Sequence, residues 1–339
     1  MKIYAGFDSG GTSTRCLLAD EQGHILGVGK GGPSNFLFCG RELAAASIKD
    51  SLNEAFRASG CAEAEISGMF IASAAVEVFG GEDHAGFFRE VTGCPHVECD
   101  SDIFPVWFGG GLPRFAPAIC TIAGTGAVTY LLSGSRFVKS SGWGPLFGDE
   151  GSGYDIGQKA LKLCSCMSDL REPMDPEFYG AVLKHYQVDE DHPRRLLRAA
   201  GQPREDGLGQ DYRSRAASVT RVVDQLAVQG NASARRLFDE AAENVVRSVE
   251  AVIRRSGQED PYDYHEKDSG ETFNLVLSGG LFRPESPLTL AVKEKLAGNT
   301  RISDITLPRV PAVQSAAAIA LFRASRQEAA ERLMEESYE

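Results

Sequence analysis

Residues 2–20 have the sequence KIYAGFDSGGTSTRCLLAD, and they decide the fold class. The alternation over residues 2–7 predicts a β-strand, and the apolar run over residues 14–20 predicts a second one. Between them lies the glycine-rich turn Asp8-Ser9-Gly10-Gly11-Thr12. Glycines let backbone amides point at an anion, a threonine hydroxyl can donate to it, and an aspartate can hold a hydrated Mg²⁺. Taken alone, this stretch is better explained as an ordinary glycine turn.

The same hairpin design occurs again from residue 118 onward. Residues 118–123 predict a strand, Gly124-Thr125-Gly126 predicts a turn, and residues 127–133 predict a second strand. Counted from Gly10 to Gly124, the two turns lie 114 residues apart, which is a domain-sized offset. Two glycine turns at equivalent places of a duplicated unit predict two loops that hold one polyphosphate.

The rest of the chain has an α/β pattern. Residues 41–58 repeat apolar positions every three or four residues, which predicts a helix, and residues 66–72 and 96–99 predict further strands. After residue 150 the pattern is mainly helical, with a short strand predicted at residues 274–277. The chain has 339 residues, more than one core usually supports, so two domains are expected.

The composition is that of a globular, acidic protein. There are 35 Lys and Arg against 47 Asp and Glu, so the formal net charge is −12, and hydrophobic residues make up 42%. This charge argues against a nucleic-acid or anionic-lipid partner bound through a basic surface. The apolar runs are too short to span a membrane and no signal peptide is recognisable, so a cytoplasmic protein is expected. The eight cysteines include no Cys-x-x-Cys pair and are expected to be core thiols.

Three other motifs are excluded. The chain has no Gly-x-x-x-x-Gly-Lys-Ser/Thr motif, so it is not a P-loop protein. Residues 27–32 match the Gly-x-Gly-x-x-Gly dinucleotide pattern, but Pro33 follows and no helix begins at once, as that fingerprint requires. Cys94, His96 and Cys99 do not have the spacing of a common zinc site.

Four further features carry candidate functional residues. Asn35 lies on a loop, where it serves equally well as a turn residue or as a ligand contact. Asp100 ends a predicted strand, where carboxylates often face a ligand crevice, although it could instead cap a helix. Residues 142–153 combine aromatic residues, several glycines and an acidic pair, which favours a shaped pocket over a plain helix cap. Ser278-Gly279-Gly280 follows a strand and lets a flat group approach the backbone, with a tight turn as the alternative.

Together these motifs resemble the N-acetylglucosamine kinase group of the BadF/BadG/BcrA/BcrD ATPase family, on the sugar-kinase side of the actin-like ATPase superfamily. The likeness extends over almost the whole chain. Its most specific part is Gly142-Trp143-Gly144 followed by Gly148-Asp149-Glu150-Gly151-Ser152. It implies a duplicated actin-like (ribonuclease H-like) α/β fold, with two domains and a cleft between them. The expected domains are residues 1–115 and 116–325, with a helix of about residues 326–339 returning to the first domain.

The resemblance also implies a role for each candidate residue. The protein would be an ATP-dependent kinase that phosphorylates an amino sugar, most simply on its 6-hydroxyl, with Mg-ATP as cofactor and the sugar as small-molecule partner. Asp100 would be the catalytic base, and Asp8 would hold Mg²⁺ through water. ATP would be bound by the two turns and by the glycine pair beside adenosine, namely Gly10, Gly11, Thr12, Ser13, Gly124, Thr125, Gly126, Gly279 and Gly280. The sugar would be bound by Asn35, Gly142, Trp143, Gly144 and Asp149.

An alternative base and one departure from the family pattern bear on these roles. Asp102 lies close enough to Asp100 to be an alternative base, and Asp100 is preferred because it directly ends the strand. Ala127 stands where relatives usually have Ser, so a hydroxyl near the phosphate or the sugar is missing. The pattern leaves open which amino sugar is accepted, what residues 189–215 do, and the oligomeric state, for which a homodimer is one expectation because related kinases are often dimers.

Two other functions compete with the kinase. A dehydratase-activating ATPase of the same family would need cysteines in a motif that bridges an iron–sulfur cluster, and no cysteine lies in such a motif. A non-catalytic sugar or nucleotide sensor would not need Asp8, Asp100 and Asp149 together. The sequence therefore favours the kinase over both.

Overall fold

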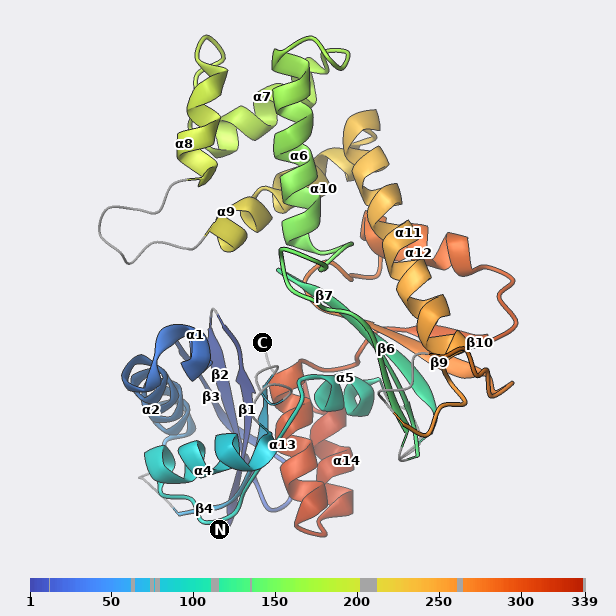
Figure 1. Cartoon of the computed structure of the whole chain (residues 1–339). Helices are drawn as coiled ribbons and strands as arrows, with labels where there is room; N and C mark the ends of the chain where they lie inside the picture. Colours follow the sequence, from blue (N-terminus) through green and yellow to red (C-terminus); the bar gives the residue numbers. More distant parts are fainter. Residues whose placement is uncertain are drawn as a thin grey trace. The chain divides into compact units, whose positions relative to one another are not determined.

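The computed structural model describes residues 1–11, 13–61, 65–73, 76, 80–110, 116–134, 136–201, 212–260 and 265–337. The chain divides into two compact units, Met1–Arg114 together with Pro308–Glu339, and Phe115–Leu307 (Figure 1). Each unit is built around its own five-stranded mixed sheet with helices packed on it.

The sheet of the first unit begins with the predicted hairpin. Its strand order is β3-β2-β1-β4-β5, in which β1, β4 and β5 are parallel and β2 is antiparallel to both of its neighbours. Side chains alternate across a strand, so β1 places Phe7 on one face and Tyr4 on the other. The strands are β1 (Ile3–Ser9), β2 (Thr14–Asp20), β3 (Ile25–Gly31), β4 (Ile66–Ala72) and β5 (Val97–Asp100).

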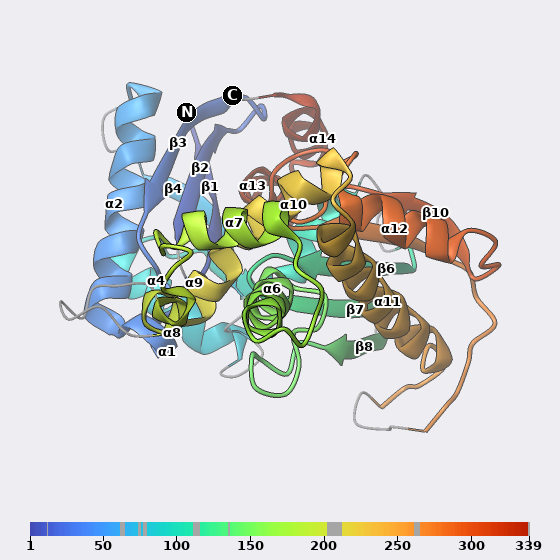
Figure 2. The same ribbon diagram turned by 90° about the horizontal axis from the view of Figure 1, so that it is seen from above.

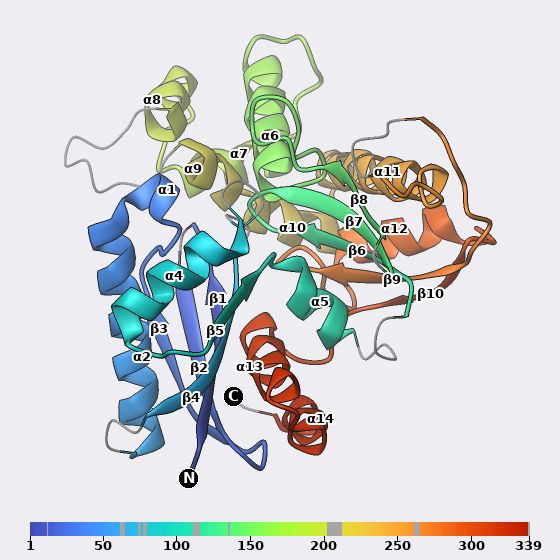
Figure 3. The same cartoon turned by 60° about the horizontal axis from the view of Figure 1, so that its bottom comes forward.

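Helices cover both faces of this sheet (Figure 3). The face with Phe7 packs against α2 and α4, and the face with Tyr4 packs against α13 and α14. The helices of the first unit are α1 (Phe36–Cys39), α2 (Arg41–Ser59), α4 (Gly81–Thr92), α5 (Ile103–Gly109), α13 (Ala312–Arg323) and α14 (Gln327–Glu335).

The glycines of β3 have a packing role. A Cβ on Gly27, Gly29 or Gly31 would overlap a carbonyl oxygen of α2, so only glycine lets this helix lie directly on the strand. The alternating glycines therefore account for the match of residues 27–32 to the dinucleotide pattern, which the sequence had already excluded on other grounds.

Residues 308–325, which include the helix α13, belong to the first unit, whereas the domain bounds expected from the family resemblance put them in the second domain. The helix packs on β1 and β4, and its backbone lies so close to Gly6 that a Cβ there would overlap the Ala317 nitrogen. A run of small apolar residues such as that of α13 fits closely on either sheet, so its composition alone does not specify which unit it joins.

Gly6→Ala is expected to destabilise the first unit. The added methyl group must push α13 off the strand, and overpacking of this kind typically costs about 1–3 kcal/mol. Thermal unfolding of the variant should show a melting temperature lower by roughly 2–4 °C for each kcal/mol lost. Gly201→Ala is the matched control, because a Cβ at that position meets no atom within 4 Å. Equal melting temperatures for Gly6→Ala and the control would contradict the close packing of α13.

The sheet of the second unit repeats the topology of the first. Its order, read from the β8 side, is β8-β7-β6-β9-β10. In both units the third strand along the chain is therefore followed across the sheet by the second, first, fourth and fifth. The duplication predicted from the two glycine turns is therefore a duplication of the whole sheet. The strands are β6 (Ala118–Ala123), β7 (Ala127–Ser133), β8 (Arg136–Ser141), β9 (Phe273–Ser278) and β10 (Ile302–Thr306).

The second unit is mainly helical outside this sheet. Its core joins Ile119 and Leu131 of the sheet to Phe178 and Phe238 of the helices, and Figure 2 shows α11 beside β6, β7 and β8. The helices are α6 (Gly153–Ser168), α7 (Pro176–His185), a short 3₁₀ helix (Pro193–Arg195), α8 (Leu196–Gly201), α9 (Tyr212–Ser218), α10 (Thr220–Gln229), α11 (Ala232–Arg254) and α12 (Pro287–Leu296). Within the described ranges, no helix is both long and apolar enough to cross a membrane.

Candidate functional site

The carboxyl ends of β1, β4 and β5 bring two predicted site residues to one edge of the first sheet. Asp8 is in register with Ala72, and Ala72 is in register with Asp100. Neighbouring strands lie about 4.8 Å apart, so the Cα atoms of the two aspartates are roughly 10 Å apart. Residues in register point to the same face, and Ala72 packs in the cluster that contains α13. Both carboxylates therefore project from that face of the sheet edge.

Asp8 has the properties of a cation ligand. Burial raises the pKa of its carboxyl, and the Arg15 guanidinium opposes this shift. No described residue donates a hydrogen bond to this carboxylate. Mg²⁺ commonly takes one or two protein carboxylates and completes its coordination with water and phosphate oxygens. A desolvated carboxylate with unused acceptors thus fits the metal that the sequence predicts.

Asp100 is half-buried, and its Oδ1 accepts a hydrogen bond from the Ser101 backbone nitrogen at 2.7 Å. Burial raises the pKa of Asp100, while the Ser101 amide and the Arg323 guanidinium lower it and Glu98 raises it further. Asp102 has a different position, because it precedes α5 at the N-cap and already has helical backbone angles. The sheet edge thus carries Asp100, and the start of a helix carries Asp102.

A pair of hydroxyl groups ties the loop of residues 32–35 to the first glycine turn. The Ser34 backbone nitrogen donates to the Gly10 carbonyl at 3.1 Å. The Ser34 and Ser9 hydroxyl oxygens are 2.7 Å apart and buried. Asn35, which is only 6% exposed, is consequently held on the same edge of the sheet as Asp8.

The first glycine turn has an open backbone. Gly10 N donates to Ser13 O at 3.1 Å, which closes the turn. Gly11 is exposed, and a Cβ there would meet no atom within 4 Å. Thr12, the predicted hydroxyl donor, lies outside the described residues.

The second glycine turn is fixed on the N-terminus of α6. Gly124 N donates to Gly126 O at 2.9 Å within the turn. The first amides of the helix donate to the same turn, Gly153 N to Gly124 O at 2.7 Å and Tyr154 N to Thr125 O at 3.2 Å. The dipole of this 16-residue helix favours an anion near the turn.

The glycine pair after β9 packs against the second turn. Ile122 of β6 is in register with Ser278 of β9, so the two strands end at the same edge. Gly279 has a φ of 101°, and a Cβ there would overlap the carbonyl oxygen of Ala123. Gly280 is open, because a Cβ there would meet no atom within 4 Å. The structure thus brings the two predicted nucleotide segments of the second unit together.

The loop after β8 presents exposed aromatic and apolar side chains. Gly148 N donates to Gly144 O at 2.9 Å, so the loop closes on itself. Trp143, Leu146 and Phe147 are 72%, 82% and 81% exposed. The predicted sugar-binding Trp143 is therefore at the surface of its unit and outside the core.

Asp149 is buried in a constrained conformation. Its φ of 61° is left-handed, as is that of Gly142 at 72°, and aspartate tolerates this region better than most residues. Its side chain is 4% exposed, and its Oδ2 accepts a hydrogen bond from Arg213 Nη2 at 2.6 Å. A Cβ on Gly126 would lie 3.1 Å from the same Oδ2. The predicted sugar-binding carboxylate thus lies directly on the predicted phosphate turn.

Two contacts at these edges, that of Arg213 with Asp149 and that of Ser34 with Ser9, were not predictable from local sequence. Arg213 follows Asp149 by 64 residues, in the stretch of residues 189–215 that has no recognisable motif. Ser34 is adjacent to the predicted Asn35, but nothing in the sequence pairs it with Ser9. Ala127, where the missing hydroxyl was expected to matter, begins β7 and packs in the apolar core of the second unit.

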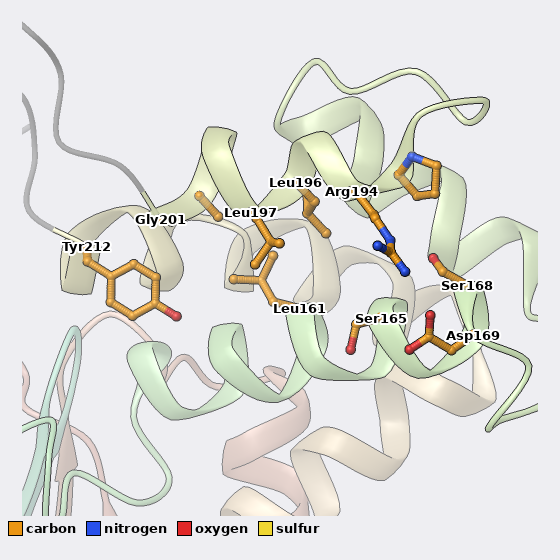
Figure 4. A pocket seen from close by; sticks show the side chains of 11 residues that line it. Leu161, Ser165, Ser168, Asp169, Arg194, Leu196, Leu197, Gly201 and Tyr212 are labelled. Carbon is orange, nitrogen blue, oxygen red and sulfur yellow. The ribbon is translucent and has the colours of Figure 1, made fainter.

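A pocket of about 350 Å³ lies among α6, α8 and α9 (Figure 4). Leu161, Leu196 and Leu197 line its middle, with Arg194 towards one end and Tyr212 at the other. None of the described residues that line it is a predicted site residue, so it is separate from the candidate site.

Similar proteins support the same fold and family. The N-acetylmuramic acid/N-acetylglucosamine kinase of Clostridium acetobutylicum is 28% identical over 268 residues, which cover 75% of this chain and 80% of that protein. The N-acetyl-D-glucosamine kinase of Dictyostelium discoideum is 22% identical, covering 94% of this chain and 98% of that protein. The crystal structure of a proposed N-acetylglucosamine kinase from Chromobacterium violaceum covers 95% of this chain and 99% of that one, with a TM-score of 0.67 and 22% identity.

The structural likeness shows the fold, which is the duplicated two-domain α/β architecture of the actin-like ATPases and sugar kinases. The sequence pattern of the BadF/BadG/BcrA/BcrD ATPase family matches residues 5–320. This match begins in β1 and ends in α13, so it contains every edge described above. The chain belongs to the BadF/BadG/BcrA/BcrD ATPase family.

Proposed function

We propose that the protein is an ATP-dependent kinase that phosphorylates the 6-hydroxyl of an amino sugar such as N-acetylglucosamine. Membership of an ATPase family and two relatives named as N-acetylglucosamine kinases, at 28% and 22% identity, support this function. The observation that carries the proposal is the register of Asp8, Ala72 and Asp100. This register puts Asp8, which is suited to binding a metal ion, and Asp100, which is suited to accepting a proton, on the same face of the sheet at the carboxyl ends of their strands.

Asp100 is the general base in this proposal. The attacking hydroxyl must lose a proton as it approaches the γ-phosphate in line, and a nearby carboxylate can accept it. Burial raises the pKa of Asp100, which makes the ionised group a stronger proton acceptor. The Ser101 amide fixes Oδ1, and among the described residues none donates to Oδ2, which is therefore available to the substrate.

The glycine turns supply the phosphate contacts in this proposal. The residues proposed for these contacts are Gly10, Gly11 and Ser13 of the first unit and Gly124-Thr125-Gly126 of the second. A Cβ on Gly11 or Gly124 would meet no atom within 4 Å, and the N-terminus of α6 adds a favourable dipole beside the second turn. Asp8 holds the water shell of Mg²⁺, which when bound neutralises part of the charge on the phosphates. The open backbone at Gly280, beside Gly279, is suited to the flat adenine or its ribose.

Asn35, Asp149 and the Trp143 loop supply the sugar contacts. A buried amide and a buried carboxylate are precise hydrogen-bond partners for hydroxyl groups, because their orientation is fixed by their surroundings. The exposed indole of Trp143 offers a flat apolar surface for a sugar ring or an acyl group, and the flanking Gly142 and Gly144 keep side chains away from it.

The test is ADP release from Mg-ATP, measured without sugar and then with each of a panel of amino sugars and hexoses. Strong stimulation by an amino sugar, with the product phosphorylated at the 6-position, is the expected result. ADP release that is equal with and without every sugar would instead favour the dehydratase-activating type of ATPase. Nucleotide binding with no ADP release under any condition would favour a sensor and contradict the kinase.

A further inference from the structure

The ion pair between Asp149 and Arg213 joins two segments that no motif connects. Arg213 belongs to α9 and reaches Asp149 with an Nη2 to Oδ2 distance of 2.6 Å. The carboxylate side chain is 4% exposed and the guanidinium side chain 34% exposed. An ionised carboxylate so far from water is costly unless a cation and hydrogen bonds compensate it, and Arg213 provides both.

The same guanidinium lies on the second glycine turn. A Cβ on Gly126 would overlap Arg213 Nη2 and would come within 3.1 Å of Asp149 Oδ2. Glycine at this position therefore makes room for the ion pair directly on the backbone of the turn. This arrangement fixes where the carboxylate points relative to the turn.

The backbone alone does not fix the Asp149 carboxylate. Its carbonyl accepts from Ser152 N at 3.1 Å, which anchors the main chain in its left-handed conformation. The hydrogen bond to the carboxylate itself comes from Arg213. The Arg213 Nε is buried and has no hydrogen-bond partner among the residues that the structure describes, so the guanidinium also has a donor that this contact does not use.

We infer that Arg213 is a positioning residue for the acceptor sugar: its hydrogen bond fixes the orientation of the Asp149 carboxylate, so that this carboxylate can accept hydrogen bonds from sugar hydroxyls. The inference rests on the proposed function, because it needs Asp149 to bind sugar. It adds a specificity-determining residue from α9, and it requires no contact between Arg213 and the substrate. Sugar affinity is then a joint property of two residues that lie 64 positions apart.

A double-mutant cycle tests this inference. The variants are Arg213→Met, which keeps the stem and removes the charge, Asp149→Asn, and the two combined. Arg213→Lys tests rescue by a cation, and Arg221→Met is the matched control, because Arg221 is an exposed arginine of the neighbouring α10. The measurements are kcat and the KM values for sugar and ATP, with the melting temperature of each variant.

Arg213→Met should raise the sugar KM by about 10- to 100-fold, as expected for losing a charge-assisted contact, with kcat and the ATP KM changed by less than about threefold. In the Asp149→Asn background the same substitution should change the sugar KM by less than about threefold, because the coupled pair is already broken.

Arg213→Lys should recover most of the sugar affinity, and Arg221→Met should behave as the wild type. If Arg213→Met does not fold, the Arg213→Lys and Asp149→Asn variants decide, with a sugar KM between wild type and Asp149→Asn expected for Arg213→Lys.

Two results would overturn the inference while leaving the kinase in place. A lower kcat with an unchanged sugar KM would mean that Arg213 acts directly on the transferred phosphoryl group. An effect of Arg213→Met that is equally large in the Asp149→Asn background would mean that it does not act through Asp149. Absence of sugar-dependent ADP release from the wild type would instead overturn the proposed function, and the inference with it.

Discussion

We expect Asp100→Asn to lower kcat by about 10²- to 10⁴-fold, the usual contribution of a general base, while the KM values for sugar and ATP change by less than about threefold. Asn keeps the shape of the side chain and can still accept a hydrogen bond from the Ser101 amide, so the sheet edge is preserved. It cannot take up the proton of the attacking hydroxyl. Steady-state ADP release with the best sugar of the panel measures this loss.

The pH dependence gives a second readout of the same residue. A base works only when ionised, so its activity is lost as the pH falls through its pKa. Burial raises the pKa of Asp100 above the ordinary 3.8, so the acid limb of kcat/KM should lie above the pH expected of an exposed aspartate. The residual activity of Asp100→Asn should lack this limb.

Stability separates a catalytic role of Asp100 from a structural one. When the folded state raises the pKa of an acid, the ionised form costs stability at any pH above the unfolded value, and the neutral form does not. Asp100→Asn should therefore keep or raise the melting temperature at neutral pH.

Asp102→Asn is the matched control and should retain activity. Asp102 precedes the helix α5 and is not in register with Asp8 and Ala72, as Asp100 is. A control variant as inactive as Asp100→Asn would move the base to Asp102.

Most strands of the two sheets could be predicted because their signals are local, whereas β10 (Ile302–Thr306) was not predicted. The predicted strand of residues 14–20 is β2 (Thr14–Asp20), and the predicted helix of residues 41–58 is α2 (Arg41–Ser59). Period-two alternation, apolar runs and helical spacing each depend on residues within a few positions of one another. The same holds for the turns, because glycine clusters mark them directly. The repeated hairpin then extends these local signals to the topology of two sheets.

Contacts between distant segments could not be predicted in this way. The sequence shows that Asp100 ends a strand, but only the register of β4 and β5 puts it in one row with Asp8. It shows that α13 is a helix of small residues, and only the close approach to Gly6 assigns it to the first unit. Arg213 lies in a stretch without periodicity, so its pairing with Asp149 has no sequence signal at all.

Asp149→Ala is expected to raise the sugar KM by at least about 100-fold. A hydrogen bond to a charged group contributes about 1.5–3 kcal/mol, and a carboxylate that accepts from two sugar hydroxyls loses both contacts when it is removed. The kcat should fall far less, because the groups proposed for proton transfer and phosphate binding remain. Sugar titrations at saturating ATP measure the change, and an unaltered sugar KM would contradict the assignment of Asp149 to the sugar.

The alanine variant changes the backbone as well as the side chain, and two further substitutions separate these effects. Asp149 has a φ of 61°, a region that asparagine and glycine tolerate better than alanine. Asp149→Gly removes the carboxylate without backbone strain, so it should bind sugar as weakly as Asp149→Ala but unfold at a higher temperature. Asp149→Asn keeps one acceptor and the backbone preference, so its sugar affinity should lie between those of alanine and the wild type. If sugar affinity followed the melting temperature across the three variants, the loss of affinity would come from backbone strain. We expect it instead to follow the number of acceptor atoms at position 149, because the carboxylate recognises the sugar.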